Sequence, residues 1–442
     1  MFIRNALAAL LLTLAPVAIP AAARADTVVV TAGRMLDVKT GRYVEEPVIV
    51  ITDGRIASVV GRDGGRPNIP QGARRIDLPG MILLPGLIDM HVHLTSSPFI
   101  RGYRRLEVTD AFWPTLGVPN AQKMLDAGFT TIRSMGAGNY ADVAVRQGID
   151  RGFYPGPRIV AAGPSFGPTG GHCDTNDLPP SITFREGERG VNGPDEVRAR
   201  VRELRRRGAN VIKICATGGV FSINTEPGAQ QMTEAEMRAA AEEAHMLGLK
   251  VAAHAHGTDG IKAAIRAGID TIEHASFLDA EAIRMAREAG IWLSMDIYNT
   301  EYTLAEGERN GVPQENIDKE RQVGTRQRES FRQAVAGGVR HVFGTDAGVY
   351  PHGTGARQFR TMVQFGMTPI QAIRTATSNA AEALGRSADV GTIEVGRFGD
   401  LVAVSRDPLA DVRALEEVMV VIKGGLLAAD RRGAAARQGA GQ

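Results

Sequence analysis

The stretch that decides the fold is Pro85-Gly-Leu-Ile-Asp-Met-His-Val-His93, which follows the apolar run Met81–Leu84. Successive side chains of a β-strand alternate between its two faces, so His91 and His93 point the same way. Two neutral imidazoles on one side of a strand end can bind one divalent cation. A His-x-His pair alone is weak support for a metal site, so the rest of the chain has to supply the argument.

Downstream, a pattern of helix, glycine and short apolar strand repeats along the chain. Glycine suits the left-handed end of a helix, and Thr233 with Glu236, and Pro194, mark two helix starts. With the strand before His91 and the run Arg158–Ala162, the pattern gives eight strands alternating with helices. We therefore predict an α/β fold, a (β/α)8 TIM barrel, with an open doubly wound sheet as the alternative. No Gly-x-Gly-x-x-Gly fingerprint supports a dinucleotide fold. The repeats are Gly128–Arg133, Gly208–Lys213, Gly248–Ala253, Gly268–Glu273, Gly290–Met295 and Gly338–Phe343.

Both ends of the chain have a different character. β-branched runs separated by glycine and aspartate turns predict strands there. We expect one small β-sandwich domain built from residues 26–84 and 387–428, flanking the barrel at 85–386, and a disordered tail at 429–442. The runs are Thr27–Thr31, Val48–Thr52, Ile56–Val60, Gly391–Gly396, Asp400–Val404 and Val418–Ile422.

The first 25 residues read as a secretory signal peptide. Arg4 precedes a mostly apolar segment, Ala6–Ala18, and Ala23-Arg24-Ala25 is a small-x-small cleavage site. The apolar segment is short for a membrane-spanning helix. We therefore expect an exported protein, periplasmic or secreted, that begins at Asp26 and has no membrane association after cleavage.

Composition and cysteine content narrow the possible partners. The formal net charge of +2 gives no reason to expect a nucleic-acid partner. Cys173 and Cys215 are the only cysteines and could pair in an oxidising compartment, but two cysteines do not define a disulfide scaffold. Buried or free thiols are the default interpretation.

Polar residues end several of the predicted strands, where TIM barrels gather their functional groups. Each has a structural alternative: a core histidine, a turn, or, for Asp346, a helix N-cap. Lys213 is the least expected, because lysine is seldom buried without a partner. Beside metal ions it would lose its proton readily and could react with carbon dioxide, giving a carbamate that bridges two cations. The set is His91, His93, Lys213, His254, His274 and Asp346.

With these motifs in this order, the chain resembles the amidohydrolase superfamily with a binuclear metal centre, and in particular its imidazolonepropionase-like branch. That branch includes Xaa-Pro dipeptidase-like enzymes, carboxypeptidases acting on Xaa-Arg or Xaa-Lys, and ochratoxin-hydrolysing amidases. The resemblance spans Thr27 to Val421, with Ser134 where the branch commonly carries Asp. The motifs that carry it are Gly128–Arg133, Thr169–His172, Ile212–Gly219, Ala252–Gly257, Ile272–Ser276 and Gly344–Gly353.

The resemblance implies a role for each residue of the set. One divalent ion, which we expect to be zinc, would be held by His91, His93 and Asp346. The second would be held by His254 and His274, with carboxylated Lys213 bridging the two. Asp346 would also take a proton from the attacking water and pass it to the leaving amine. Candidate substrate contacts are His172, which could instead be a surface-loop histidine, and His256, Tyr298 and His352.

The implied function is hydrolysis of the amide or peptide bond in dipeptides or N-acyl amino acids, with ochratoxin A as a candidate substrate. The metal ligands alone also allow a ring-opening hydrolase of lactones or cyclic amides, a deaminase or a phosphotriesterase. A barrel that binds without catalysis is a further alternative, which the complete ligand set disfavours. We expect a small-molecule or peptide substrate and a homo-oligomer.

Overall fold

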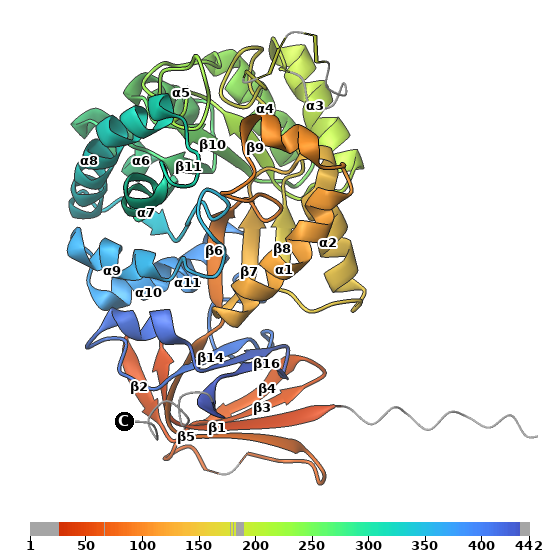
Figure 1. The fold of residues 1–442 in the computed structure, drawn as a ribbon. Helices are drawn as coiled ribbons and strands as arrows, with labels where there is room; N and C mark the ends of the chain where they lie inside the picture. Colours follow the sequence, from red (N-terminus) through yellow and green to blue (C-terminus); the bar gives the residue numbers. More distant parts are fainter. Residues whose placement is uncertain (1–25, 66, 177, 180, 183–189, 434–442) are drawn as a thin grey trace, which may run out of the picture.

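Eight short strands form the centre of the larger part of the molecule in the computed structural model (Figure 1), which describes residues 26–65, 67–176, 178, 179, 181, 182 and 190–433. The predicted signal peptide lies outside these residues. The strands form two parallel sheets, β6-β7-β8 and β13-β12-β11-β10-β9. Their bounds are β6 Leu87–Val92, β7 Phe129–Ser134, β8 Arg158–Ala161, β9 Ile212–Cys215, β10 Val251–Ala255, β11 Thr271–His274, β12 Trp292–Ser294 and β13 Arg340–Val342.

Backbone hydrogen bonds join the two sheets at both seams. At one seam the Met90 amide donates to the Phe343 carbonyl (2.8 Å), just beyond β13. At the other, the Asn210 amide, just before β9, donates to the carbonyl of Ala161 at the end of β8 (2.9 Å). Beyond β8, the Phe166 amide donates to the Lys213 carbonyl (3.2 Å), and the Cys215 amide donates to the Phe166 carbonyl (2.9 Å). The α/β fold is confirmed. The predicted single barrel sheet is divided here into two sheets that these bonds connect.

Helices cover the outer faces of the strands (Figure 1). The capping box of Thr233 and Glu236 is formed, and Pro194 occupies the first turn of its helix. The six glycines that begin the predicted repeats all have φ between 67° and 100°, as expected of left-handed helix ends. The helices are α1 Phe112–Asp126, α2 Ala141–Asp150, α3 Pro194–Arg206, α4 Glu234–Met246, α5 Thr258–Arg266, α6 Ala280–Glu288, α7 Asn299–Glu306, α8 Gln314–Ala336, α9 Arg357–Gln364, α10 Pro369–Thr375 and α11 Ser378–Ala383. Short 3-10 helices are η1 Gly102–Glu107, η2 Gly138–Tyr140 and η4 Val412–Glu417.

Both ends of the chain contribute to a separate eight-stranded sheet below the helices in Figure 1. Its strand order is β16-β15-β14-β5-β1-β3-β4, with β2 paired to β1. In the middle, β14 from the C-terminal half pairs antiparallel with β5, so Leu401 lies opposite Pro85. The strands are β1 Thr27–Asp37, β2 Arg42–Glu45, β3 Val48–Thr52, β4 Arg55–Val60, β5 Arg74–Pro85, β14 Leu401–Val404, β15 Val420–Lys423 and β16 Leu426–Asp430.

Two predictions about the ends need correction. No strand forms over Gly391–Gly396, where both glycines have φ of 90° and therefore cannot continue an extended strand. The predicted tail also starts too early, because β16 extends to Asp430, and Arg432 forms an ion pair with that residue (2.6 Å). Residues 434–442 lie outside the described part of the chain. The division of the sheet into a sandwich and the exact domain boundaries stay predictions.

The connection from β5 to β6 positions the first histidine pair. β5 ends at Pro85 in the terminal sheet, and β6 begins two residues later at Leu87 in the centre of the helical part. The Gly86 amide between them donates to the Asp400 carbonyl (2.8 Å). Within the described residues, no helix has both the length and the apolar character needed to cross a membrane.

Candidate metal centre

The first group of candidate metal ligands lies where β6 ends. The Nε2 atoms of His91 and His93 are 3.4 and 3.3 Å from Oδ1 of Asp346. Asp346 has a left-handed backbone (φ 57°), and its amide donates to the His91 carbonyl (2.7 Å), which holds the carboxylate over the strand end. The three ligand atoms lie within 4.8 Å of one another, a set that can hold a divalent metal.

Both histidines turn Nε2 towards Asp346 and have a hydrogen-bond acceptor at Nδ1. His91 Nδ1 lies 2.8 Å from Glu273 Oε2, and His93 Nδ1 lies 3.2 Å from the carbonyl oxygen of Gly136. Because these partners accept hydrogen bonds, we assign the ring protons to the Nδ1 atoms. Burial lowers the pKa of His91 to about 4, so this ring is neutral at pH 7.

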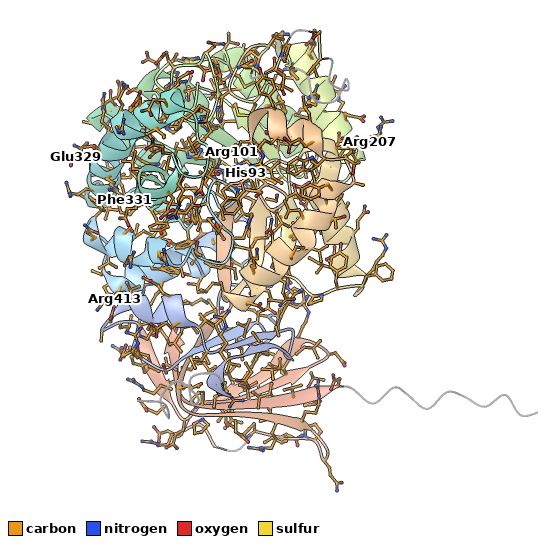
Figure 2. All side chains as sticks on the ribbon, viewed as in Figure 1. His93, Arg101, Arg207, Glu329, Phe331 and Arg413 are labelled. Atoms are coloured by element: carbon orange, nitrogen blue, oxygen red, sulfur yellow. A yellow bond between two sulfur atoms is a disulfide. The ribbon has the colours of Figure 1, made fainter. Side chains whose placement is uncertain are left out.

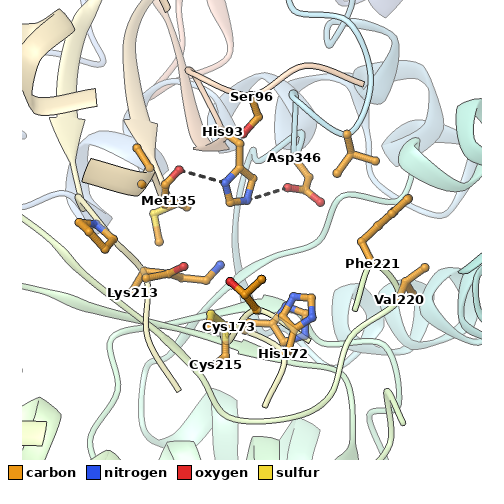
Figure 3. Close-up of a pocket in the computed structure, with 18 of the residues that line it drawn as sticks. His93, Ser96, Met135, His172, Cys173, Lys213, Cys215, Val220, Phe221 and Asp346 are labelled. Atoms are coloured by element: carbon orange, nitrogen blue, oxygen red, sulfur yellow. Dashed lines mark hydrogen bonds and ion pairs between the residues drawn. A yellow bond between two sulfur atoms is a disulfide. The ribbon is translucent and has the colours of Figure 1, made fainter. Parts of the chain in front are cut away.

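Figure 3 shows His93 facing the carboxylate of Asp346, with a dashed line for their 3.3 Å ion pair. Its Oδ1 is buried and accepts no hydrogen bond from the described residues. Burial raises its pKa, but the neighbouring His91 and His93 outweigh this and hold the pKa far below its usual range. An ionised carboxylate oxygen that faces the Nε2 atoms of two histidines fits a bound cation.

Behind His91 lies a buried network that fixes its ring. Arg133 on β7 donates from Nη2 to Glu273 Oε1 (2.7 Å) and from Nη1 to Thr271 Oγ1 (3.0 Å). Arg133 and Glu273 are both almost fully buried. Burial raises the pKa of Glu273, but Arg133 and the bond to His91 outweigh it, and the net shift is strongly downward. The ionised carboxylate therefore holds the tautomer of His91.

A second group of histidines lies at the ends of β10 and β11. His254, His256 and His274 present ligand nitrogens within 4.8 Å of one another, and all three are buried. His274 Nδ1 lies 2.8 Å from Asp296 Oδ1, so its Nε2 is the nitrogen available for a metal. His274, Asp296 and Asp346 form a third such group, which links the two sides of the centre.

Lys213 lies between these groups. It belongs to β9, is 3% exposed, and its Nζ is 3.5 Å from His91 Nε2. Burial lowers its pKa to about 8, although Glu273 and Asp346 act in the opposite direction. Ile212 and Ile214, on either side, belong to the apolar core. Strand alternation therefore points the lysine to the polar interior, as predicted.

These groups open into a pocket of about 730 Å³, part of which Figure 3 shows. Of the four predicted substrate contacts, His172 and His256 line it. The His172 ring stacks on that of His254 with centroids 4.0 Å apart, and its Nδ1 is 2.8 Å from Ser222 Oγ. Its place beside the ligand set fits the predicted pocket role better than a surface-loop role.

The other two predicted contacts do not line the pocket. Tyr298 is buried at the start of α7, where its hydroxyl accepts a hydrogen bond from Arg357 (3.0 Å). The Nε2 of His352 bonds to the carbonyl oxygen of His93 (3.2 Å), on the backbone behind the ligand side chain. Asn299, the neighbour of Tyr298, does line the pocket, and its Nδ2 donates to Asp346 Oδ2 (3.4 Å).

The two cysteines form a disulfide in the pocket wall, with Cα atoms 5.8 Å apart. The default interpretation of free thiols is therefore wrong for this structure. Cys173 follows His172, and Cys215 is the last residue of β9, two residues after Lys213. The disulfide thus ties the loop of a substrate-contact candidate to the strand of a ligand candidate (Figure 3).

Comparison with known proteins adds to this geometry. The model of the amidohydrolase family matches residues 82–427, most of the chain. The chain belongs to this family. It is therefore a hydrolase from a family that acts on small molecules and is typically metal-dependent. Its own clusters of histidine and aspartate are able to bind metal.

Relatives of this amidohydrolase include an ochratoxinase and a Xaa-Pro dipeptidase. Ochratoxinase of Aspergillus niger is 31% identical over 440 residues, covering 93% of this chain and 88% of that protein. The crystal structure of that ochratoxinase has a TM-score of 0.81 at 28% identity, covering 92% of this chain and 97% of that one. A Xaa-Pro dipeptidase with methionine bound in its active site has a TM-score of 0.85 at 36% identity, covering 91% and 99%.

Sequence reasoning missed the residues that support the candidate metal ligands. Glu273 directly precedes His274, and Arg133 ends the motif before Ser134, so both stood in recognised motifs without an assigned role. Asp296 follows β12 at the position where other strands end in ligand candidates. This position at a strand end could have identified Asp296 from the sequence.

Proposed function

We propose that this protein is a binuclear metal-dependent amidohydrolase that cleaves the amide bond of dipeptides or N-acyl amino acids. The observation that carries the proposal is the convergence of His91 Nε2 and His93 Nε2 on the donor-free Oδ1 of Asp346. This arrangement opens into a pocket large enough for a dipeptide. The ochratoxinase and dipeptidase relatives support amide-bond chemistry and make ochratoxin A a candidate substrate.

The residues present fit two ions, which we take to be zinc. His91, His93 and Asp346 would hold one, and His254 and His274 the other. Lys213, as a carbamate, would bridge them, and its lowered pKa favours the uncharged amine that reacts with carbon dioxide. When bound, the metals would polarise the scissile carbonyl and lower the pKa of the attacking water.

The protein's own groups then have distinct tasks. The Arg133–Glu273 pair fixes His91 so that its Nε2 stays aimed at the centre. Asp296 does the same for His274. Asp346 is ionised, so it can accept the proton of the attacking water and deliver it to the departing amine nitrogen. Its hydrogen bond from Asn299 keeps the carboxylate in place for this transfer.

The test combines metal analysis with a substrate screen. The purified protein should contain close to two zinc ions per chain, and it should release free amino acids from dipeptides or N-acyl amino acids, detected with ninhydrin. Removal of metal by a chelator should abolish the hydrolysis, and added zinc should restore it. Full activity in a preparation shown by elemental analysis to be metal-free would contradict the proposal. Activity confined to lactones, cyclic imides or phosphotriesters would assign a different reaction.

A further inference from the structure

One face of helix α8 forms part of the pocket. Glu320, Val323 and Gln327 all line it, and their spacing of three and four residues places them on one side of the helix. Gln327 donates to Asp296 Oδ1 (2.9 Å), so this face of α8 contacts a residue of the candidate metal centre. Glu320 has no part in the proposed mechanism, although it faces the same cavity.

Glu320 is a buried acid that forms no ion pair with the described residues, although His274 and Arg328 lie near enough to favour its charged form. It is 4% exposed, and its Oε1 accepts a hydrogen bond from Thr300 Oγ1 (2.5 Å). The neighbouring cations of α8 have other partners: Lys319 bonds to the Ser222 carbonyl (2.9 Å), and Arg321 pairs with Asp318 (2.6 Å). A buried carboxylate in this state is unfavourable unless a positive charge reaches it.

The surroundings place this carboxylate near the reaction site. Thr300, which bonds to Glu320, follows Asn299, which bonds to Asp346. Burial raises the pKa of Glu320 to about 7, and nearby Asp296 adds to the rise. Among the described residues, four other acids line the pocket. Asp110 is exposed, unlike Glu320, and Asp296 and Asp346 belong to the histidine clusters. Asp174 receives the backbone amide of Gly170 (2.9 Å).

We propose that Glu320 binds a positively charged nitrogen of the substrate and thereby selects ammonium-bearing peptides over neutral N-acyl amino acids. The inference rests on the proposed function and assigns a determinant of its substrate choice. Two sources supply this chemistry: the α-ammonium of a dipeptide, or a lysine-like side chain. Either would satisfy the Oε2 atom, for which the described residues provide no hydrogen bond.

Two substrate pairs separate these sources. Leu-Phe and 4-methylpentanoyl-Phe differ only in the α-ammonium group. The pair 4-methylpentanoyl-Lys and 4-methylpentanoyl-norleucine lacks the α-ammonium and differs only in the charged end of the side chain. In the Glu320→Gln variant, kcat/KM for the charged member of one pair should fall roughly 10- to 100-fold, with a change of less than about twofold for its neutral partner. The affected pair identifies which nitrogen is bound.

Two further variants complete the design. Glu320→Asp keeps the negative charge but, with a shorter side chain, moves it away from the substrate. It should therefore lower kcat/KM for the charged member by a smaller factor, with the same selectivity. Glu329→Gln makes the same change on the solvent-facing part of α8, far from His93 in Figure 2, and should change neither pair. Zinc content and the thermal unfolding midpoint, Tm, are measured for each variant, and Glu320→Asp replaces Glu320→Gln if the latter does not fold.

Equal losses for the charged and neutral members in both pairs, or no loss for any of the four compounds, would overturn the role of Glu320. The proposed function fails separately: a wild-type enzyme that carries zinc yet cleaves no member of either pair would show that. A wild-type enzyme that cleaves all four compounds, with no change in selectivity in Glu320→Gln, would leave the function intact and refute this inference alone.

Discussion

The imidazole of His91 faces a carboxylate on each side, Glu273 at Nδ1 and Asp346 at Nε2. Only one of these contacts can use the single ring proton of a neutral histidine. The spacing of His91 and His93 predicted that both rings point one way. It could not predict the partner of Nδ1, because Glu273 lies 182 positions away in the chain. Long-range pairing of this kind depends on the tertiary fold.

Replacement of Lys213 tests its bridging role at the scale of one residue. In Lys213→Ala the carbamate cannot form, so zinc content and hydrolysis should fall together, with activity lowered by at least about 100-fold. A short-chain carboxylic acid such as propionate should restore part of both, because its carboxylate can occupy the vacated space. Zinc is measured by elemental analysis alongside initial rates.

The matched control is Lys250→Ala, which removes an exposed lysine that pairs with Asp270 at the surface. It should keep both zinc and activity. A Lys213→Ala enzyme with full activity would show that the buried lysine only fills space in the interior.

At the scale of the elements, β11 is a strand whose side-chain directions could not be predicted from the alternation of its residues. Alternation along Thr271–His274 would send Glu273 and His274 to opposite faces of the strand. The backbone of His274 instead has φ of 69°, followed by 47° at Ala275, which brings both side chains to the centre. The strands and their order could be read from apolar runs and glycines. A left-handed backbone at a non-glycine residue such as His274 cannot be recognised from the sequence pattern. The same holds for Gly391–Gly396, where the β-branched run predicted a strand that does not form.

The disulfide links the loop that carries His172 to strand β9, and this link gives a second prediction. It closes a sequence separation of 42 residues, and loop closure of this length stabilises a fold by up to about 4 kcal/mol. The double variant Cys173→Ser, Cys215→Ser should therefore have a lower Tm. Its KM should rise because the His172 loop is no longer held to β9, whereas its zinc content should not change.

Calorimetry of the wild type with and without a reductant provides the comparison, and thiol titration of the unfolded protein reports the redox state. The prediction is wrong if two free thiols are found in the oxidised sample. It also fails if loss of the disulfide leaves both Tm and KM unchanged.

At the scale of the whole molecule, two sheets meet where β5 passes into β6, so the terminal sheet is anchored directly to the strand of the first histidine pair. Composition could predict that both chain ends join one sheet, because both show the same β-branched runs. The polar interior was only partly predictable: Lys213 and His91 stood out at strand ends. Arg133 did not, because a buried arginine becomes acceptable only when a partner such as Glu273 is present.

The charges in the pocket wall decide what kind of amide the enzyme should prefer. Among the described lining residues, Arg105 and Lys213 are the only arginine or lysine, and the proposed carbamate removes the positive charge of Lys213. Arg105, with His172 and Asn299, therefore remains to receive the free carboxylate of a C-terminal amino acid. Leu-Phe should be a much better substrate than its C-terminal amide, because groups suited to the anion stay unmatched in the amide complex.

Arg105→Gln should remove most of that preference by lowering kcat/KM for Leu-Phe roughly tenfold or more while leaving the amide nearly unchanged. Arg104→Gln is the matched control, since Arg104 is the adjacent arginine of η1, has a largely exposed side chain and does not line the pocket. The measurement is kcat/KM for acid and amide with the three proteins, each with its zinc content known. Equal values for the acid and the amide in the wild type would refute carboxylate recognition. An acid preference that survives Arg105→Gln would instead assign it to His172 and Asn299, whose positions beside the ligands are fixed by Ser222 and Asp296.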